Sequence, residues 1–309
     1  SYIPNSVVEN FEKETGIVVN YSTYSSNEEL LAKLSNAKEG TYDLIFPSDY
    51  MVEIMKTRNL IELIDITKLN NFNNINKRYL NLEYDQNNEY TIPFIAATTV
   101  IAVNRDKVTE RINSYNDLLD SKYKNEIVLI DDQRIIIGMA LLANGYDMNS
   151  VNKDELEVAK NWLFKLKKNL KAFDSDSPKN FLISNEASIA VLWNAEGALA
   201  SMENSNIENI FPIEGVAVSI DNFAIPKGAK NKDELYQFID YILRPEVMKK
   251  IISSYPYKNV NRETDNLLGW DYLSNPAANI SSSVFDNGLF VENIGSNISM
   301  YDKIWAEIK

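Results

Sequence analysis

The sequence contains neither cysteine nor histidine, and these absences remove much of the chemistry that enzymes use. Without cysteine there is no disulfide, zinc–thiolate site, iron–sulfur cluster or cysteine nucleophile. Without histidine there is no Ser-His-Asp triad, no histidine-bound metal and no use of the commonest general acid and base. Carboxylates, lysine and tyrosine remain for catalysis. The sequence also lacks a run of 18 apolar residues, so no transmembrane segment is predicted.

Basic side chains are scarce, with 31 Lys and Arg against 44 Asp and Glu and a net charge of −13. This balance argues against nucleic acid as a partner and favours cations. The 309 residues, of which 45% are hydrophobic, are enough for two globular domains. Glycine-rich nucleotide-binding motifs and the HExxH motif are also absent, so no cofactor or metal is predicted.

The N-terminal residues have neither the basic nor the apolar region of a signal peptide. A secreted protein in its mature form shares this property. The absence of cysteine does not decide the location either, because it is compatible with the cytoplasm and with a bacterial envelope.

The first sixty residues alternate between helical and strand patterns. Because this alternation is typical of crossover units, we expect an α/β fold with a mostly parallel sheet. The expected elements are a helix capped by Ser6 and ended by Gly16, a strand at Ile17–Tyr21, a helix capped by Asn27, a strand at Asp43–Pro47 and a helix that begins at Ser48.

A second alternation follows the β-prone run Tyr90–Asn104, which is long for one strand and suits a segment that passes from one domain to the next. The expected strands are Ile127–Ile130, Ile189–Leu192 and Val216–Asp221, and the expected helices are a Met- and Leu-rich stretch ending near Gly145, Lys153–Lys168, Asp233–Leu243 and Met300–Lys309.

Polar and aromatic residues follow three of these strands, at 48–50, 131–132 and 193–194. Ligands of open α/β sheets bind beyond the carboxyl ends of strands. Carboxylates with aromatic neighbours there suit an organic cation. The alternatives are that Asp132 is a helix N-cap and that Tyr50 and Trp193 are core aromatics. Paired carboxylates could also hydrolyse a glycoside, although nothing in the spacing favours this.

Several segments resemble the spermidine/putrescine-binding proteins, the soluble receptors of polyamine uptake transporters. The most specific are FEKETGIVVNYSTYSSNEELLAKL and YDLIFPSDY, joined by LIDDQR, VLWNAEGA and DNFAIPKGAKN, and the resemblance extends over nearly the whole chain. It implies a two-lobed α/β periplasmic-binding-protein fold of type II, with the ligand held in the cleft between the lobes. The lobes would comprise 1–97 with 222–264 and 98–221 with 265–309.

The resemblance also implies a set of ligand-binding residues. Asp132 and Asp221 would bind the amines, Trp193 would lie along the alkyl chain, and the remaining contacts would come from Tyr2, Ser48 and Tyr50.

Other positions depart from the family pattern. Ile135 stands where a Glu is common, Ser219 and Ala96 where a Trp is common, and Val291 where a Gln is common. Glu196, three residues after Trp193, is a candidate replacement for the acceptors that are lost. Family members usually have an apolar strand upstream of Tyr2, so we expect the sheet of the first lobe to lack one strand.

The function that these expectations describe is a polyamine receptor of an ABC importer, not an enzyme. It would be a monomer that works with a membrane permease and an ATPase, in a periplasmic or extracellular location, with a lipid anchor on an upstream segment as one option. The alternatives are a receptor for another amine-bearing metabolite and a carboxylate-dependent hydrolase.

Overall fold

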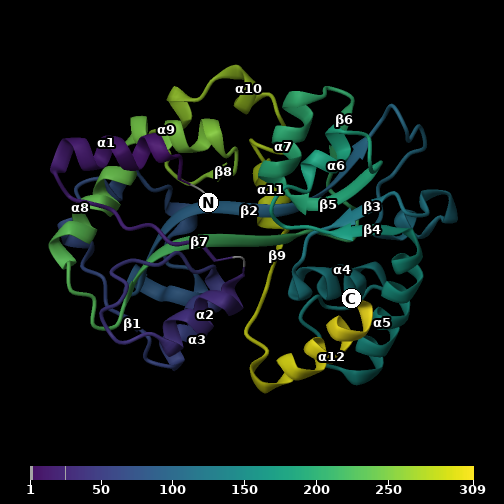
Figure 1. Cartoon of the computed structure of the whole chain (residues 1–309), viewed down its shortest axis with the longest axis horizontal. Coiled ribbons are helices and arrows are strands. Elements are labelled where there is room, and N and C mark those ends of the chain that lie inside the picture. The colour runs from purple at the N-terminus through teal and green to yellow at the C-terminus, as the bar shows by residue number, and fades with distance from the viewer. Residues whose placement is uncertain (1–2, 25) are drawn as a thin grey trace. The chain divides into compact units, whose positions relative to one another are not determined.

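Strand β2 (Thr91–Asn104) carries the chain from one α/β unit into another, and all of its residues are buried (Figure 1). The computed structural model describes residues 3–24 and 26–309. Unit 1 comprises the chain up to Ala96 together with Ser219–Ser274, and unit 2 comprises Ala97–Val218 and Asn275–Lys309. The chain therefore changes unit within β2, within β7 (Ala217–Pro226) and again after Ser274.

These boundaries differ from the expected lobes at three places: 219–221 and 265–274 lie in unit 1, and Ala97 lies in unit 2. Local contacts explain the first two. Asp221 accepts a hydrogen bond from Ser48 of unit 1 at 2.6 Å, and Asp265 accepts one from Asn259 at 2.8 Å. Tyr272 adds a hydroxyl bond to the carbonyl of Tyr257 at 3.0 Å.

Unit 1 combines short strands with helices around the first part of β2 and the second part of β7. Strand β1 pairs antiparallel with β7, and β8 pairs antiparallel with β2. The elements are α1 (Asn5–Thr15), α2 (Asn27–Asn36), α3 (Asp49–Thr57), β1 (Ile61–Glu62), η1 (Ile66–Lys68), η2 (Phe72–Asn74), η3 (Lys77–Tyr79), η4 (Glu83–Asn88), α8 (Lys232–Ile242), α9 (Pro245–Ser254), β8 (Lys258–Asn259), η8 (Asp265–Leu267) and α10 (Trp270–Leu273).

Aromatic packing holds unit 1 together. The rings of Phe46, Phe94 and Phe223 contact one another, with centroids 4.9–5.6 Å apart. Phe94 and Phe223 belong to β2 and β7, so this cluster fixes the segment before α3 against both strands. Aromatic pairs of this kind contribute about 0.5–1.5 kcal/mol beyond their burial.

Four details of the predicted elements in unit 1 are wrong. The predicted strand Asp43–Pro47 contains only an isolated bridge, at Ile45. The 17–21 segment also forms no strand: Val18 is 73% exposed, and the amide of Val19 donates to the Glu12 side chain at 2.7 Å. The cap of α2 is Ser26, whose hydroxyl accepts from the Glu29 amide, and not Asn27. Helix α1 begins at Asn5 after Pro4, so Ser6 lies inside it.

Unit 2 contains a mixed sheet with the strand order β6-β2-β5-β3-β4. Its strands pair parallel in β3–β4, β3–β5 and β7–β9 and antiparallel in β2–β5 and β2–β6. The mostly parallel sheet predicted from the first sixty residues is wrong for unit 1, where β1–β7, β2–β8 and the bridge between Ile45 and Ala224 are antiparallel. The elements are η5 (Tyr115–Leu119), η6 (Ser121–Tyr123), β3 (Ile127–Leu129), α4 (Gln133–Ala143), α5 (Lys153–Leu166), η7 (Lys167–Asn169), β4 (Leu170–Phe173), α6 (Lys179–Ile183), β5 (Ile189–Trp193), α7 (Asn194–Glu203), β6 (Ile207–Ile210), α11 (Ser282–Asp286), β9 (Leu289–Phe290), η9 (Gly295–Asn297) and α12 (Ile298–Ile308).

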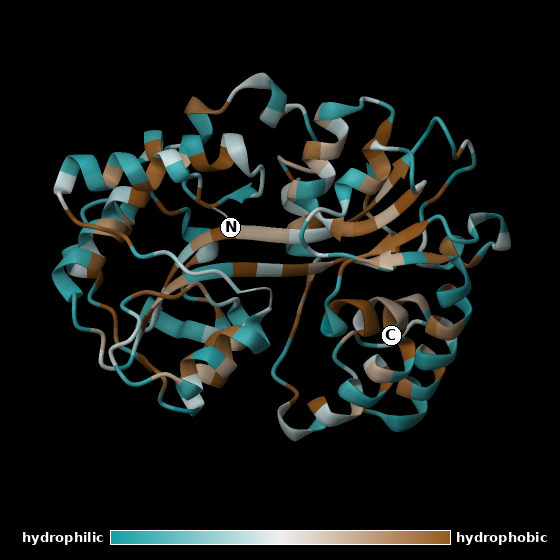
Figure 2. Ribbon diagram, viewed as in Figure 1, coloured by the Kyte–Doolittle hydropathy of each residue, from teal (hydrophilic) through white to brown (hydrophobic). Residues whose placement is uncertain are grey.

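Helices cover both faces of this sheet. Helices α4, α5 and α12 pack together on one side, and α6 and α7 lie on the other (Figure 1). The strands between them are strongly hydrophobic (Figure 2), as expected for strands that are buried on both faces. Among the residues that the structure describes, no helix has the length and apolarity needed to cross a bilayer.

We predict that Gly197→Ala destabilises unit 2, because α7 packs closely on the sheet there. A Cβ at this position would overlap Asn209 Oδ1 and lie 2.9 Å from Val100 Cγ2. The expected loss is about 1–3 kcal/mol of unfolding free energy, measured by urea or thermal unfolding. Gly269→Ala is the control, since nothing lies within 4 Å of a Cβ there, and it should change stability by less than about 0.5 kcal/mol. Equal stability of the two variants would contradict the prediction.

Candidate functional site

A direct hydrogen bond joins Ser48 and Asp221, which lie 173 residues apart in the sequence. The Ser48 hydroxyl donates to Asp221 Oδ1 at 2.6 Å, and each residue is 9% exposed. Backbone bonds set up this contact: Ile45 and Ala224 exchange hydrogen bonds of 3.0 and 2.9 Å, and the Asn222 amide donates to the Pro47 carbonyl at 2.9 Å. The chain before α3 is thus paired with β7 up to the point where the two polar side chains meet.

Asn27 orients the Ser48 hydroxyl, a role that the sequence did not suggest. Its Oδ1 accepts from the Ser48 amide and its Nδ2 donates to Ser48 Oγ, both at 3.0 Å. A hydroxyl has one hydrogen to donate. Because Ser48 Oγ accepts from Asn27, its hydrogen points to Asp221. The sequence pattern assigned Asn27 to helix capping and so concealed this contact.

Asp49 is a second carboxylate at this point; it lies in the 48–50 group noted in the sequence, but it was not among the predicted ligand residues. It is the first residue of α3 and is only 2% exposed. Its Oδ1 accepts a long hydrogen bond, 3.4 Å, from Ser219. Burial raises the pKa of Asp49 well above its usual range, and the charge of Asp221 raises it further, against the opposing hydrogen bond from the Tyr50 amide.

Two tyrosines are close enough to the carboxylates to be influenced by their charge, Tyr24 by Asp221 and Tyr84 by Asp49. Tyr24 donates to the Phe46 carbonyl, and Tyr84 donates to Asn222 Oδ1 at 3.0 Å. Burial raises both pKa values, and the charge of Asp221 adds to the shift of Tyr24. Both tyrosines therefore remain neutral donors near neutral pH. The predicted ligand residue Tyr50 is half-buried and donates to Glu28 at 3.0 Å.

In unit 2, Asp132 is the N-cap of α4, as one of the two sequence interpretations proposed. Its Oδ1 accepts from the amides of Arg134 and Ile135 at 2.9 and 3.1 Å, and the residue is half-buried. A carboxylate has about four acceptor positions, and the two capping hydrogen bonds use only part of this capacity. The cap therefore fixes the position of Asp132 and leaves a ligand role chemically open.

Trp193 ends β5 opposite Thr99 of β2 and is half-buried, so it is not a fully enclosed core aromatic. The next residue, Asn194, is fully buried and fixes the chain there. Its Oδ1 accepts from the Thr98 amide at 3.1 Å, and its Nδ2 donates to the Ala277 carbonyl at 2.8 Å.

Glu196 has a structural contact within unit 2. Its carboxylate accepts from the amide of Lys179, the first residue of α6, and burial raises its pKa against the opposing charge of Lys179. One oxygen of the Glu196 carboxylate is thus engaged at the start of α6, whereas Oε2 is buried without a hydrogen-bond partner.

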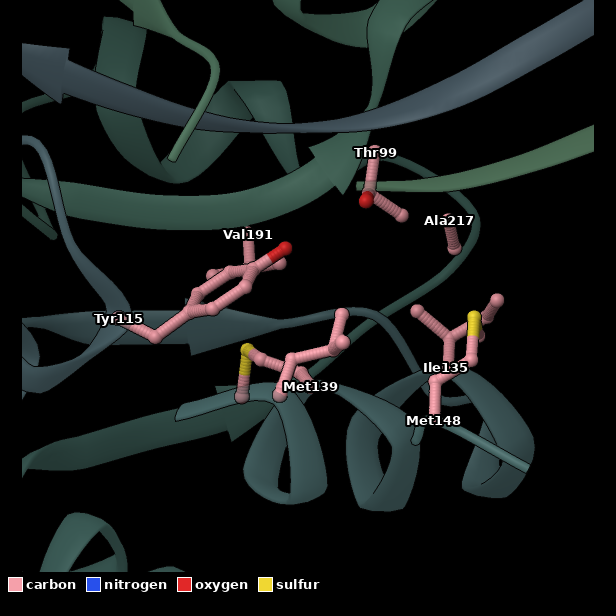
Figure 3. Close-up of a pocket in the computed structure, with 8 residues that line it drawn as sticks. Thr99, Tyr115, Ile135, Met139, Met148, Val191 and Ala217 are labelled. Carbon is pink, nitrogen blue, oxygen red and sulfur yellow. The ribbon is translucent and has the colours of Figure 1, made fainter. Parts of the chain in front are cut away.

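The apolar positions among the candidates are enclosed by other side chains. Ile135 is 4% exposed and lines a narrow pocket of unit 2 with Met139, Met148 and Val191 (Figure 3). This space has no room for a water molecule. Val291 is 7% exposed. Neither side chain can accept a hydrogen bond from an amine.

The remaining candidates are Ser219, which is 9% exposed and contacts Asp49, and Tyr2, which lies outside the described residues. Within 3–24 and 26–309, no group of three or more acidic side chains is arranged to hold a metal ion.

Comparisons with known proteins show extensive similarity. The family model described as bacterial extracellular solute-binding protein matches residues 6–275. The spermidine/putrescine-binding periplasmic protein of Escherichia coli (strain K12) is 37% identical over 309 residues, which cover 100% of this chain and 89% of that protein. The putrescine-binding periplasmic protein PotF of the same organism is 33% identical over 295 residues, covering 89% and 80%.

Solved structures agree with these matches. The substrate-binding protein PotD of a spermidine/putrescine ABC transporter from Streptococcus pneumoniae has a TM-score of 0.85 at 30% identity, with 100% of this chain and 95% of that chain covered. The Tp0655 (TpPotD) lipoprotein of Treponema pallidum has a TM-score of 0.89 at 29% identity, with 100% and 96% covered. These similarities confirm the two-lobed α/β fold of type II that the sequence predicts.

We predict that Asp49→Asn stabilises the protein at pH values above the unfolded carboxyl pKa of about 3.9, with a gain that grows as pH rises toward the raised pKa of Asp49. A carboxyl whose folded pKa lies above the unfolded value of about 3.9 stabilises the fold in its protonated form, and this contribution is lost as pH rises through the folded pKa. Asparagine mimics the protonated acid. The expected gain at neutral pH is about 1–3 kcal/mol, disappearing in acid, and thermal unfolding as a function of pH measures it. A variant less stable than the parent at neutral pH would contradict this expectation.

Proposed function

The chain belongs to the family of bacterial extracellular solute-binding proteins, and we propose that it binds a polyamine, putrescine or spermidine, for an ABC importer. The observation that carries this proposal is the buried Ser48–Asp221 pair with Asp49 beside it. In this proposal the protein is a monomeric receptor that works outside the cytoplasmic membrane and hands its ligand to a permease and its ATPase.

An organic ammonium group matches the chemistry of unit 1. Asp221 and Asp49 are largely removed from water, and each raises the free energy of the other's charged form. A cation bound between them would attract both carboxylates and form charge-assisted hydrogen bonds with them, each contributing about 1.5–3 kcal/mol. The neutral hydroxyls of Tyr24 and Tyr84 supply further polar contacts close by.

Unit 2 supplies the groups for the other end of a diamine. Asp132 is fixed by the first turn of α4, and it binds the second ammonium group in this proposal. Trp193 is half-buried at the end of β5 and offers an aromatic face to the alkyl chain. A monoamine would pair with only one of these carboxylates, so the proposal favours ligands with two ammonium groups.

We predict that putrescine binds at least as tightly as spermidine in calorimetric titrations. Ile135 and Val291 are buried and apolar, so the third ammonium group of spermidine would lose hydration without gaining an acceptor. That loss of about 1–3 kcal/mol corresponds to roughly 5- to 150-fold in affinity. A clear preference for spermidine would overturn the prediction, and its loss in Glu196→Gln would identify Glu196 as the missing acceptor.

The same titration tests the function itself. Binding of neither polyamine would overturn the proposal and favour another amine-bearing metabolite. Turnover of a glycoside would favour a hydrolase.

We predict that Asp132→Asn separates the two roles of this residue. Asparagine is as good an N-cap as aspartate, so the stability should change by less than about 0.5 kcal/mol. Polyamine affinity should fall by about 1.5–3 kcal/mol because the charge is lost. Asp132→Ala, in contrast, should also lower the stability by about 1 kcal/mol. Parent-like affinity in Asp132→Asn would restrict Asp132 to capping.

A further inference from the structure

We propose that Asp49 and Asp221 together form a two-carboxylate acceptor for one terminal primary ammonium group, and that Asp49 gives up its proton when this group binds. The inference rests on the proposed function. It adds a ligand residue and a linked proton to the site at Asp221.

The geometry of β7 brings the two carboxylates together. Ser219 and Asp221 are two residues apart on this strand, so their side chains lie on the same face. Ser48 donates to Asp221, and the neighbouring residue Asp49 accepts from Ser219. Two adjacent residues at the start of α3 are thus paired with two same-face residues of β7, which holds both carboxylates on one short stretch of the strand.

The number of donors on the ligand identifies the group that fits. A primary ammonium has three N–H donors, whereas a secondary ammonium within a chain has two. Two carboxylates can take two of these donors, and a third remains for a hydroxyl or carbonyl oxygen. The acceptor therefore suits the end of a polyamine and not its interior nitrogen.

The groups that face Asp49 determine its protonation. Asp221 of β7 disfavours its charge, while the amide of Tyr50 and the hydroxyl of Ser219 favour it. Tyr84 of η4 is neutral, because the charges of Asp49, Asp85 and Asp221 add to the effect of burial, which raises its pKa. Tyr24, from the segment before α2, is likewise neutral and is influenced by Asp221. The charged group that acts on Asp49 is therefore the anion Asp221. A cation that enters beside the two carboxylates lowers the pKa of Asp49 and favours loss of its proton.

The ordinary alternative is that Asp49 serves only the first turn of α3, where a carboxylate interacts favourably with the helix dipole. Such residues are normally exposed, and Asp233 in the first turn of α8 is an example, with a side chain that is 87% exposed. Asp49 is instead 2% exposed and lies beside a second carboxylate. A helix-capping role alone would leave this arrangement with an electrostatic penalty that the hydrogen bonds from the Tyr50 amide and Ser219 offset only in part.

The test is calorimetric titration of the full chain with putrescine, at one pH, in phosphate and in Tris. These buffers have different heats of ionisation, so the difference in observed heat gives the number of protons released. The amines of putrescine keep their protons near neutral pH because alkylammonium groups have pKa values of about 10. Any released proton therefore comes from the protein.

We expect the parent to release a proton, at most about one per ligand, since one carboxyl group titrates. Its affinity should rise with pH from the ordinary carboxyl range up to the raised pKa of Asp49. Asp49→Asn should bind about tenfold more weakly at neutral pH and release no proton. Ser219→Ala, which removes a donor that favours the charged form, should release more than the parent. Asp233→Asn is the control and should match the parent in both quantities.

Putrescine binding without proton release in the parent, together with parent-like affinity in Asp49→Asn, would overturn the inference while leaving the proposed function intact. If the parent binds no polyamine at all, the proposed function fails, and this inference fails with it. The unfolding measurements with Asp49→Asn show independently that the variant is folded.

Discussion

The pairing of the 45–48 segment with β7 is the constraint on which the candidate site of unit 1 depends. Two residue pairs, Ile45 with Ala224 and Ser48 with Asp221, form isolated antiparallel bridges. They join parts of the chain that the sequence separates by more than 170 residues. The aromatic cluster of Phe46, Phe94 and Phe223 supports the same junction from the apolar side. Without this pairing the carboxylate of Asp221 would lose the hydroxyl of Ser48, and burial of its charge would be unfavourable.

Helix α3 begins where this pairing ends, and its start explains why a second carboxylate is tolerated. The amides of a first helical turn have no partners within the helix, and one of them stabilises Asp49. This contribution is too small to offset both burial and repulsion by Asp221, so the carboxyl group keeps its proton more strongly than a surface aspartate. The fold thus holds a chargeable group in its neutral form, next to a place that suits a cation.

The sequence predicted most elements because their patterns are local. The long apolar run became β2, the strand before Trp193 became β5, and Asp132 caps α4 as its position before a helical pattern suggests. The contact of Asn27 was missed because the residue matches a common helix-start pattern, which hides a tertiary contact. Asp49 was noted at a strand end, but its burial beside Asp221 depends on β7, which a local pattern does not reveal. The 17–21 segment has strand-like residues but no ladder, because pairing depends on neighbours that local patterns do not reveal.

The two proposed amine acceptors differ in how they are stabilised before a ligand arrives. Asp132 receives two amide hydrogen bonds from α4, which support its negative charge in the protein alone. Asp221 receives a hydroxyl bond but lies beside Asp49, so its surroundings oppose a second charge. An ammonium group that binds beside Asp221 supplies the countercharge that lets Asp49 ionise, so in this proposal binding at unit 1 includes loss of the Asp49 proton.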